Sequence, residues 1–263
     1  MKDKFSPDNK KNILRLSLFI GELMLINGAE TYRVEDTIIR ICKSRNFNHI
    51  NVFTSPTTII ISDYRFDGYT FMRSIKSRSI DLNKISMLNN FSRKFVANKE
   101  LSVQDAIREL KEIIHAPSYS HLVVNFWTGI GSAFFAALLE GNNLYTFIST
   151  FITSILAVMI YNKIMKVSNI PAFASLVAST FIAFIGVILT QLNILLTPGM
   201  LIVGSIMPLL PGVSFIKGTR DLISGDLISG VSRAFDAGIT AISIACGVGI
   251  ILDIWLRLGG NLP

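Results

Sequence analysis

Residues 170–190 read IPAFASLVASTFIAFIGVILT, a run of 21 residues without Asp, Glu, Lys, Arg or His. Because a helix rises about 1.5 Å per residue, this run is long enough to cross the roughly 30 Å hydrocarbon core of a bilayer. Half of the 263 residues are hydrophobic and the mean hydropathy is positive, which is unusual for a soluble domain. The sequence therefore predicts an integral membrane protein.

Four more hydrophobic segments of similar length lie on both sides of this run. They are residues 121–139, 144–162, 199–216 and 234–256. Pro117 and Ser118 mark a boundary before the first of them. We therefore predict an α-helical polytopic membrane domain of about five spans over residues 119–263, preceded by a separate domain over residues 1–118.

The first domain is predicted to have an α+β fold. Residues 13–45 have a helical pattern of apolar side chains, and residues 51–62 are rich in Val, Ile, Thr and Phe. Asp67-Gly68 before residues 69–75 indicates a hairpin. Two helices are expected to follow, with N-terminal caps at Asp81 and, as a capping box, at Ser102 with Asp105.

Basic residues are concentrated in the first half of the chain. Residues 1–121 hold 19 Lys and Arg against 13 Asp and Glu, whereas residues 122–263 hold 6 against 5. A basic domain can bind nucleic acid, but no nucleic-acid-binding fingerprint is present. The excess of Lys and Arg beside apolar spans fits a cytoplasmic domain better, so nucleic acid is not predicted as a partner.

The short connections between the spans predict the orientation. Connections 140–143 and 191–197 contain no Lys or Arg. In contrast, connection 163–169 contains two Lys residues, and connection 217–233 contains one Lys and two Arg residues. By the positive-inside rule, the N-terminal domain is cytoplasmic and the C-terminus lies outside. Arg257 is the one basic residue that opposes this orientation.

Recognised catalytic and metal-binding motifs are missing from the sequence. Cys42 and Cys246 lie far apart and are interpreted as small apolar residues, not as a disulfide or a thiolate metal site. The three histidines fall in no known motif, and HExxH, GxSxG and Walker A patterns do not occur. We therefore predict no catalytic residues, no metal, no cofactor and no enzymatic activity.

The fourth span is unusual because Pro208, Pro211 and Gly212 lie within it. Each proline lacks an amide hydrogen and obstructs the preceding helical turn, which is expected to free the carbonyls of about Gly204 and Met207. Transporters use broken helices of this kind to form substrate sites at membrane depth. A structural kink packed by neighbouring helices is the alternative.

A tandem DLISG repeat follows, within residues 217–233, KGTRDLISGDLISGVSR. Its charges at one membrane face can form a gate or a mouth that attracts carboxylate-bearing metabolites, although for any single residue a solvated interfacial turn with paired charges is the simpler interpretation. The candidate residues are Arg220, Asp221, Gly225, Asp226 and Gly230. Asp236, near the start of the last span, is a further candidate because an acid near the bilayer must be paired, hydrated or protonated.

The N-terminal domain contributes a third candidate motif. In the sequence GAETYR, Gly28 precedes Glu30 and Arg33, which lie three residues apart on a predicted helix. Ion pairing within one helix would by itself explain their spacing.

Three motifs together resemble the threonine/serine exporter family: LINGAETYRVEDTI at residues 25–38, TSPTTIII at 54–61, and PLLPGVSFIKGTRDLISGDLISGVSRA at 208–234. The resemblance runs from about residue 12 to residue 256. It implies a bacterial plasma-membrane protein that exports threonine and serine. The positions that match the family motifs are Gly28, Glu30, Arg33, Pro208, Pro211, Gly212, Arg220, Asp221, Gly225, Asp226 and Gly230.

This sequence differs from longer members of the family, which fuse a second helical bundle to the first five spans. Its length is similar to that of the larger subunit of the two-component succinate exporter. The resemblance therefore implies a separate small membrane subunit as partner, beside the small-molecule substrate and the lipid bilayer, and it leaves a homo-oligomer open. Dicarboxylate export is one alternative function. A membrane-anchored hydrolase or a regulatory ligand-binding protein is another, which the broken fourth span disfavours.

Overall fold

The computed structural model describes residues 7–65, 68–76, 79–117, 119–140, 143–195 and 197–259. The chain divides into two compact units. The N-terminal unit is Met1–Ser118 with Arg220–Ser232, and the membrane unit is Tyr119–Thr219 with Arg233–Pro263. The segment Arg220–Ser232, which contains both copies of the DLISG repeat, thus packs with the N-terminal unit, although it follows the fourth hydrophobic segment in the sequence.

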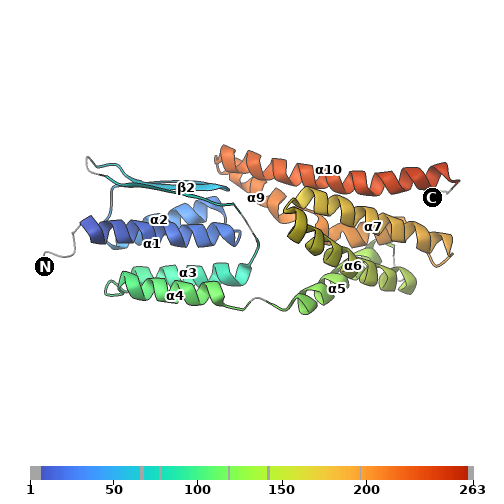
Figure 1. Cartoon of the computed structure of the whole chain (residues 1–263), viewed down its shortest axis with the longest axis horizontal. Helices are drawn as coiled ribbons and strands as arrows, with labels where there is room; N and C mark the ends of the chain where they lie inside the picture. The colour runs from blue at the N-terminus through green and yellow to red at the C-terminus, as the bar shows by residue number, and fades with distance from the viewer. Residues whose placement is uncertain are drawn as a thin grey trace. The chain divides into compact units, whose positions relative to one another are not determined.

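The N-terminal unit is built in layers (Figure 1). A three-stranded antiparallel sheet in the order β1-β2-β3 covers one side of helices α1 and α2, while helices α3 and α4 cover the other. The elements are α1 Pro7–Ile26, α2 Thr31–Ser44, β1 Ile50–Ser55, β2 Thr58–Asp63, β3 Thr70–Ser74, α3 Leu82–Ala97 and α4 Val103–His115. Fully buried Leu14, Ile38, Ile59 and Leu88 join these layers in one core.

The predicted caps of α3 and α4 are confirmed. The Asp81 carboxylate accepts a hydrogen bond from the Lys84 amide at 3.0 Å, and the Ser102 hydroxyl accepts one from the Asp105 amide at 3.1 Å. Each bond satisfies an amide that has no partner within its own helix.

The hairpin expected before residue 75 is confirmed as the β2–β3 pair, in which Ser62 lies opposite Thr70. Asp67, half of the predicted turn, lies outside the described residues. The segment 51–62 forms two strands, because the chain turns between Ser55 and Thr58 and pairs β1 with β2. Pro56, which has no amide hydrogen to donate to the sheet, lies at that turn.

Four helices in the second half of the chain are long and apolar enough to span a membrane. They are α5 His121–Glu140, α6 Leu144–Ser168, α7 Pro171–Gln191 and α10 Leu227–Arg257. A fifth candidate span is the bent pair formed by α8 Gly199–Ile206, with the short 3-10 helix η2 Met207–Leu209, and α9 Gly212–Ile223. The predicted fold class, a helical membrane protein of about five spans with an N-terminal α+β domain, is confirmed, since the structure has four to five candidate spans and an N-terminal helix and sheet region.

Several helix ends differ from the predicted span limits, and α6 continues to Ser168, beyond the expected end at residue 162. Helix α9 continues to Ile223, beyond the expected end at residue 216, and α10 begins at Leu227, ahead of the expected residue 234. Both extensions carry the DLISG repeat, whose Leu and Ile residues continue the helical apolar pattern. The repeat is therefore mostly helical, with one turn between its two copies.

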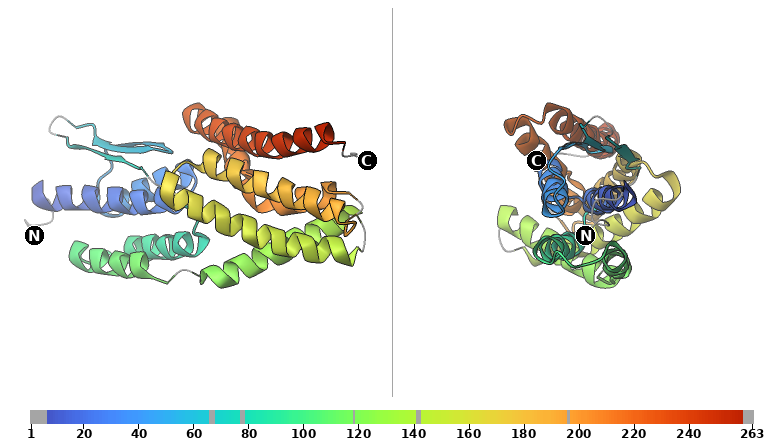
Figure 2. Two further views of the ribbon diagram at one scale, coloured as in Figure 1. Left: turned by 45° about the vertical axis from the view of Figure 1, so that its right-hand side comes forward. Right: turned by 90° about the vertical axis from the view of Figure 1, so that its left-hand side faces the viewer.

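Helix α6 lies between α5 and α7, and α8 packs against all three (Figure 2). Helix α8 comes close to α5 at Gly204. A Cβ atom there would lie 2.7 Å from the Ala136 Cβ and 3.0 Å from the Ser132 carbonyl oxygen of α5. Small residues allow such contacts between helices in a membrane.

Candidate functional site

The fourth span is broken where its prolines predict. Helix α8 ends at Ile206, a short 3-10 helix contains Pro208, and α9 begins immediately after Pro211, with a bend of 59° between the two parts. The break itself is confirmed, and its role in binding a substrate stays a prediction.

The expected free carbonyls at this break are not found. The Met207 amide donates a hydrogen bond to the Gly204 carbonyl, and the Leu210 amide donates one to the Met207 carbonyl at 3.3 Å. The expectation was wrong because the chain tightens into a 3-10 turn, which brings an amide three residues ahead onto each carbonyl. These two carbonyls therefore have protein partners.

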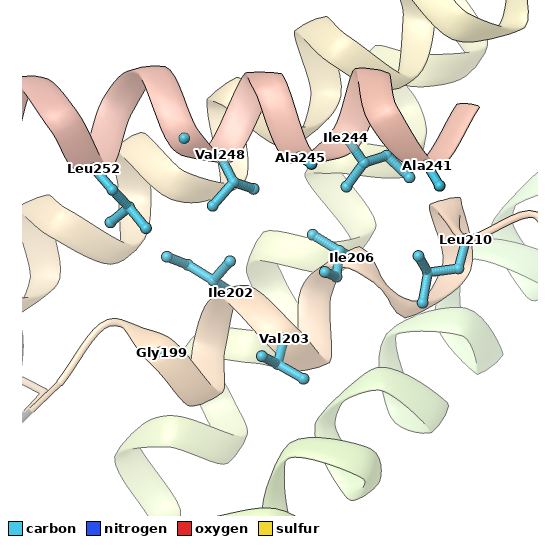
Figure 3. A pocket seen from close by; sticks show the side chains of 11 residues that line it. Gly199, Ile202, Val203, Ile206, Leu210, Ala241, Ile244, Ala245, Val248 and Leu252 are labelled. Carbon is cyan, nitrogen blue, oxygen red and sulfur yellow. The ribbon is translucent and has the colours of Figure 1, made fainter. Parts of the chain in front are cut away.

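A cavity of about 540 Å³ lies between α8 and α10 (Figure 3). Its wall consists of apolar residues: Gly199, Ile202, Val203, Ile206, Leu210, Ala241, Ile244, Ala245, Val248, Gly249 and Leu252. The small residues Ala241, Ala245 and Gly249 of α10 face this cavity. A charged metabolite would lose its hydration there without gaining polar partners, so the cavity does not match such a ligand.

Polar candidates gather instead in the N-terminal unit, where the start of α2 meets the turn between α9 and α10. Arg220 Nη1 lies 2.9 Å from Glu30 Oε1, and Arg33 Nε lies 2.9 Å from Glu30 Oε2. The Glu30 side chain is 14% exposed, whereas the two arginine side chains are 53% and 52% exposed. We call Glu30, Thr31, Arg33, Arg220, Asp221 and Asp226 the Glu30 cluster.

Tyr32 contacts both guanidinium groups of this cluster. The Arg33 Nε donates a hydrogen bond to the Tyr32 hydroxyl at 3.1 Å, and the Arg220 Cζ lies 5.3 Å from the centre of the Tyr32 ring. The hydrogen bond to Tyr32 and the charge of Glu30 both raise the pKa of Arg33. The two cations are thus fixed side by side while part of each remains exposed to solvent.

Thr31 contacts both aspartates of the cluster. Its fully buried hydroxyl donates a hydrogen bond to Asp226 Oδ2 at 2.9 Å and lies 3.5 Å from Asp221 Oδ1. Residues almost 200 positions apart in the sequence thereby meet at a single hydroxyl group.

Two glycines in left-handed conformation shape the turns that present these side chains. Gly28 and Gly225 both have φ of +87°, and each ends a helix with the paired hydrogen bonds of a Schellman motif. After Gly28 the chain enters α2 at Glu30. After Gly225, Asp226 accepts a hydrogen bond from the Ser229 amide at 3.4 Å and caps α10.

The two copies of DLISG therefore have different roles. Asp221 lies in the last turn of α9, whereas Asp226 precedes the first turn of α10. Gly225 provides the turn, and Gly230 provides space, because a Cβ there would lie 2.5 Å from the Leu222 side chain. The repeat is thus a turn between two helices whose acidic residues face α2.

Glu35 also belongs beside this cluster, although the sequence did not single it out as a site residue. Its Oε1 accepts a hydrogen bond from the Thr54 amide at 2.8 Å. Burial raises the pKa of the half-buried Glu35 carboxyl, and the negative charge of Asp226 raises it further. Its spacing of one turn from Thr31 was the signal that could have identified it.

The raised pKa of Glu35 predicts a pH-dependent stability. The native state holds this proton more tightly than the unfolded chain, so Glu35 destabilises the fold as the pH rises above the ordinary value of about 4.3. Glu35→Gln should therefore match the wild-type melting temperature near pH 4 and exceed it increasingly towards pH 7. Thermal melts of the detergent-solubilised proteins across this range measure the difference, and parallel profiles would contradict the prediction.

The structure brings some of the predicted site residues together and leaves others apart. Those in the N-terminal unit are Gly28, Glu30, Arg33, Arg220, Asp221, Gly225, Asp226 and Gly230; those in the membrane unit are Pro208, Pro211, Gly212 and Asp236. Within the described ranges, no three His, Cys, Asp or Glu side chains are grouped as a metal site requires.

Comparison with known proteins matches residues 15–255 to a family described as "Putative threonine/serine exporter" (ThrE). A Mycobacterium tuberculosis protein named "Probable threonine/serine exporter" is 24% identical over 248 residues, covering 92% of this chain and 46% of that protein. An Escherichia coli protein named "Probable succinate transporter subunit YjjP" is 22% identical over 251 residues, covering 94% and 96%. The chain thus spans about half of the first relative and almost all of the second. No solved structure matches the chain.

Proposed function

Because the chain belongs to the threonine/serine exporter family, a family of transporters and not of enzymes, we propose that it exports threonine and serine from a bacterial cytoplasm. The main structural support for this proposal is the break in the fourth span. Its 59° break at Pro208 and Pro211 is a feature that transporters use and that a membrane anchor does not need. The similarity to a relative named as a threonine/serine exporter supports the choice of substrate.

We also propose that a separate membrane subunit completes the exporter. The E. coli relative is named as a subunit, and almost its entire length is covered. Its name also supports the second candidate function, membership of a two-component dicarboxylate exporter. Efflux measurements with each labelled substrate in turn separate the two candidate functions.

The test is efflux from proteoliposomes loaded with labelled threonine, serine or succinate. The purified chain is reconstituted alone and together with a co-expressed small membrane protein of four or five spans. Threonine and serine are expected to leave only when both proteins are present. Full efflux from the single chain would reject the partner, and efflux of succinate alone would reject the proposed substrate.

The proposed orientation makes a prediction about the two ends of α6. Cysteines are introduced as Asn143→Cys and Ser168→Cys, after Cys42 and Cys246 have been replaced by Ala. An impermeant thiol reagent added to intact cells should label position 143 and spare position 168, because Ser168 lies in the segment 163–169, whose Lys163 and Lys166 predict the cytoplasmic side. The reverse pattern would invert the topology. Asn261, a second expected external position, lies outside the described residues.

A further inference from the structure

Two carboxyl groups, that of Asp226 in the Glu30 cluster and that of the neighbouring Glu35, accept hydrogen bonds from neutral donors. The Asp226 carboxylate accepts from the Thr31 hydroxyl and the Ser229 amide, and the Glu35 carboxyl accepts from the Thr54 amide. They lie close enough for the charge of Asp226 to raise the pKa of Glu35. A positively charged ligand group would stabilise both carboxylates.

Two buried hydroxyl groups accompany these carboxyl groups. Thr54 Oγ1 and Ser229 Oγ have no hydrogen-bond partner among the described residues, and these residues are 1% and 0% exposed. Each belongs to a residue whose amide holds one of the two carboxyl groups. Because an unsatisfied buried polar group is costly, these hydroxyls indicate that a polar ligand or water completes the site.

The guanidinium groups of Arg33 and Arg220 join the same cluster through Glu30, the residue before Thr31. Each carries five N–H donors, of which Glu30 and Tyr32 use only a part. Both side chains are about half exposed, so a carboxylate can reach them from solvent. Guanidinium groups bind carboxylates with paired, charge-assisted hydrogen bonds.

We propose that the Glu30 cluster, together with Glu35, binds a free α-amino acid. Its carboxylate contacts Arg33 and Arg220, and its ammonium group lies between Glu35 and Asp226. The hydroxyl of threonine or serine pairs with the buried hydroxyls of Thr54 and Ser229. The choice of amino acid rests on the proposed function. A dicarboxylate fits less well because its second carboxylate would face Glu35 and Asp226.

The experiment measures binding of tritiated L-threonine to the purified full-length chain in detergent micelles. Three competitors separate the contacts: L-threoninol lacks the carboxylate, 3-hydroxybutyrate lacks the ammonium group, and succinate has two carboxylates. On the wild-type chain, L-serine should compete with L-threonine, and each of the three competitors should bind at least tenfold more weakly than L-threonine. Equal or tighter binding of succinate would overturn the assignment.

Paired variants then identify which residues recognise which group. Arg33→Gln with Arg220→Gln should remove the preference for L-threonine over L-threoninol, and Glu35→Gln with Asp226→Asn should remove the preference over 3-hydroxybutyrate. Asparagine still caps a helix, so the start of α10 is preserved. The matched control is Asp36→Asn with Arg40→Gln, an exposed ion pair on the same helix, which should leave both preferences unchanged.

A purely structural ion-pair network predicts a different result, because its variants would weaken all ligands equally or have no effect. Either outcome would reject the site. If the paired arginine variant does not fold, Arg220→Lys replaces it in the comparison of L-threonine with L-threoninol. This single change at an exposed residue keeps the positive charge but removes the bidentate contact. Threonine efflux that survives in variants without binding preference would reject this site while the export function stands. Binding without efflux in proteoliposomes that also contain the co-expressed partner would retain the site and reject export by this chain.

Discussion

Replacing Pro208 and Pro211 together with Ala is expected to lower export at least tenfold while the protein still inserts into the membrane. A proline in a helix interior is disfavoured by about 3 kcal/mol relative to alanine, so the double variant allows α8 and α9 to join in a straighter helix. The 59° bend between the two parts of the fourth span would be lost, and α9 would then point in a different direction relative to α8. The measurement is efflux per amount of inserted protein.

The matched control for this variant is Pro171→Ala. Pro171 is the first residue of α7, a position where proline fits a helix without distortion, so its replacement should leave efflux close to the wild-type rate. Unchanged efflux in the double variant would show that the break is a packing feature. The substrate path would then be sought among polar groups of other spans: Asn125, Thr128, Ser175 and Ser179.

Gly204→Leu is expected to destabilise the membrane unit by about 3 kcal/mol or more. Even a single Cβ atom added at this position would lie within 3.0 Å of atoms in α5 and α6. One of them is the Ser132 carbonyl oxygen, which cannot move without moving its helix. The melting temperature in detergent should therefore fall. Gly131→Leu is the control, because a Cβ at Gly131 meets no atom within 4 Å. Equal melting temperatures for the two variants would contradict the packing of α8 against α5 and α6.

The hydrophobic spans could be predicted from the sequence because their signal accumulates over about 20 residues. The helix expected over residues 13–45 shows the limit of such patterns. Its apolar period continues on both sides of Gly28, yet the chain turns there in a left-handed conformation and starts a new helix at Thr31. A single glycine carries little weight against a long periodic pattern, so the break was missed.

The Glu30 cluster was predicted as two separate motifs and not as one site. Glu30 with Arg33 was explained as a pair within a helix, and Arg220 with the DLISG repeat as a membrane mouth. One sequence contains no information about which distant residues touch, so the 2.9 Å contact between Glu30 and Arg220 required the structure. Glu35 was missed for the same reason, because burial and the charge of Asp226 distinguish it from other acids.

Disulfide formation between Thr31→Cys and Asp226→Cys tests most directly whether the two motifs form one site. The side-chain oxygens of Thr31 and Asp226 lie 2.9 Å apart, which predicts rapid cross-linking under mild oxidation in membranes after Cys42 and Cys246 have been replaced by Ala. Thr31→Cys with Arg40→Cys is the control, because the helix rises about 13.5 Å over the nine steps from position 31 to position 40, beyond the reach of a disulfide. A cross-link in the first pair alone is the expected result. Its absence, with both pairs equally unreacted, would contradict the juxtaposition on which the candidate site rests.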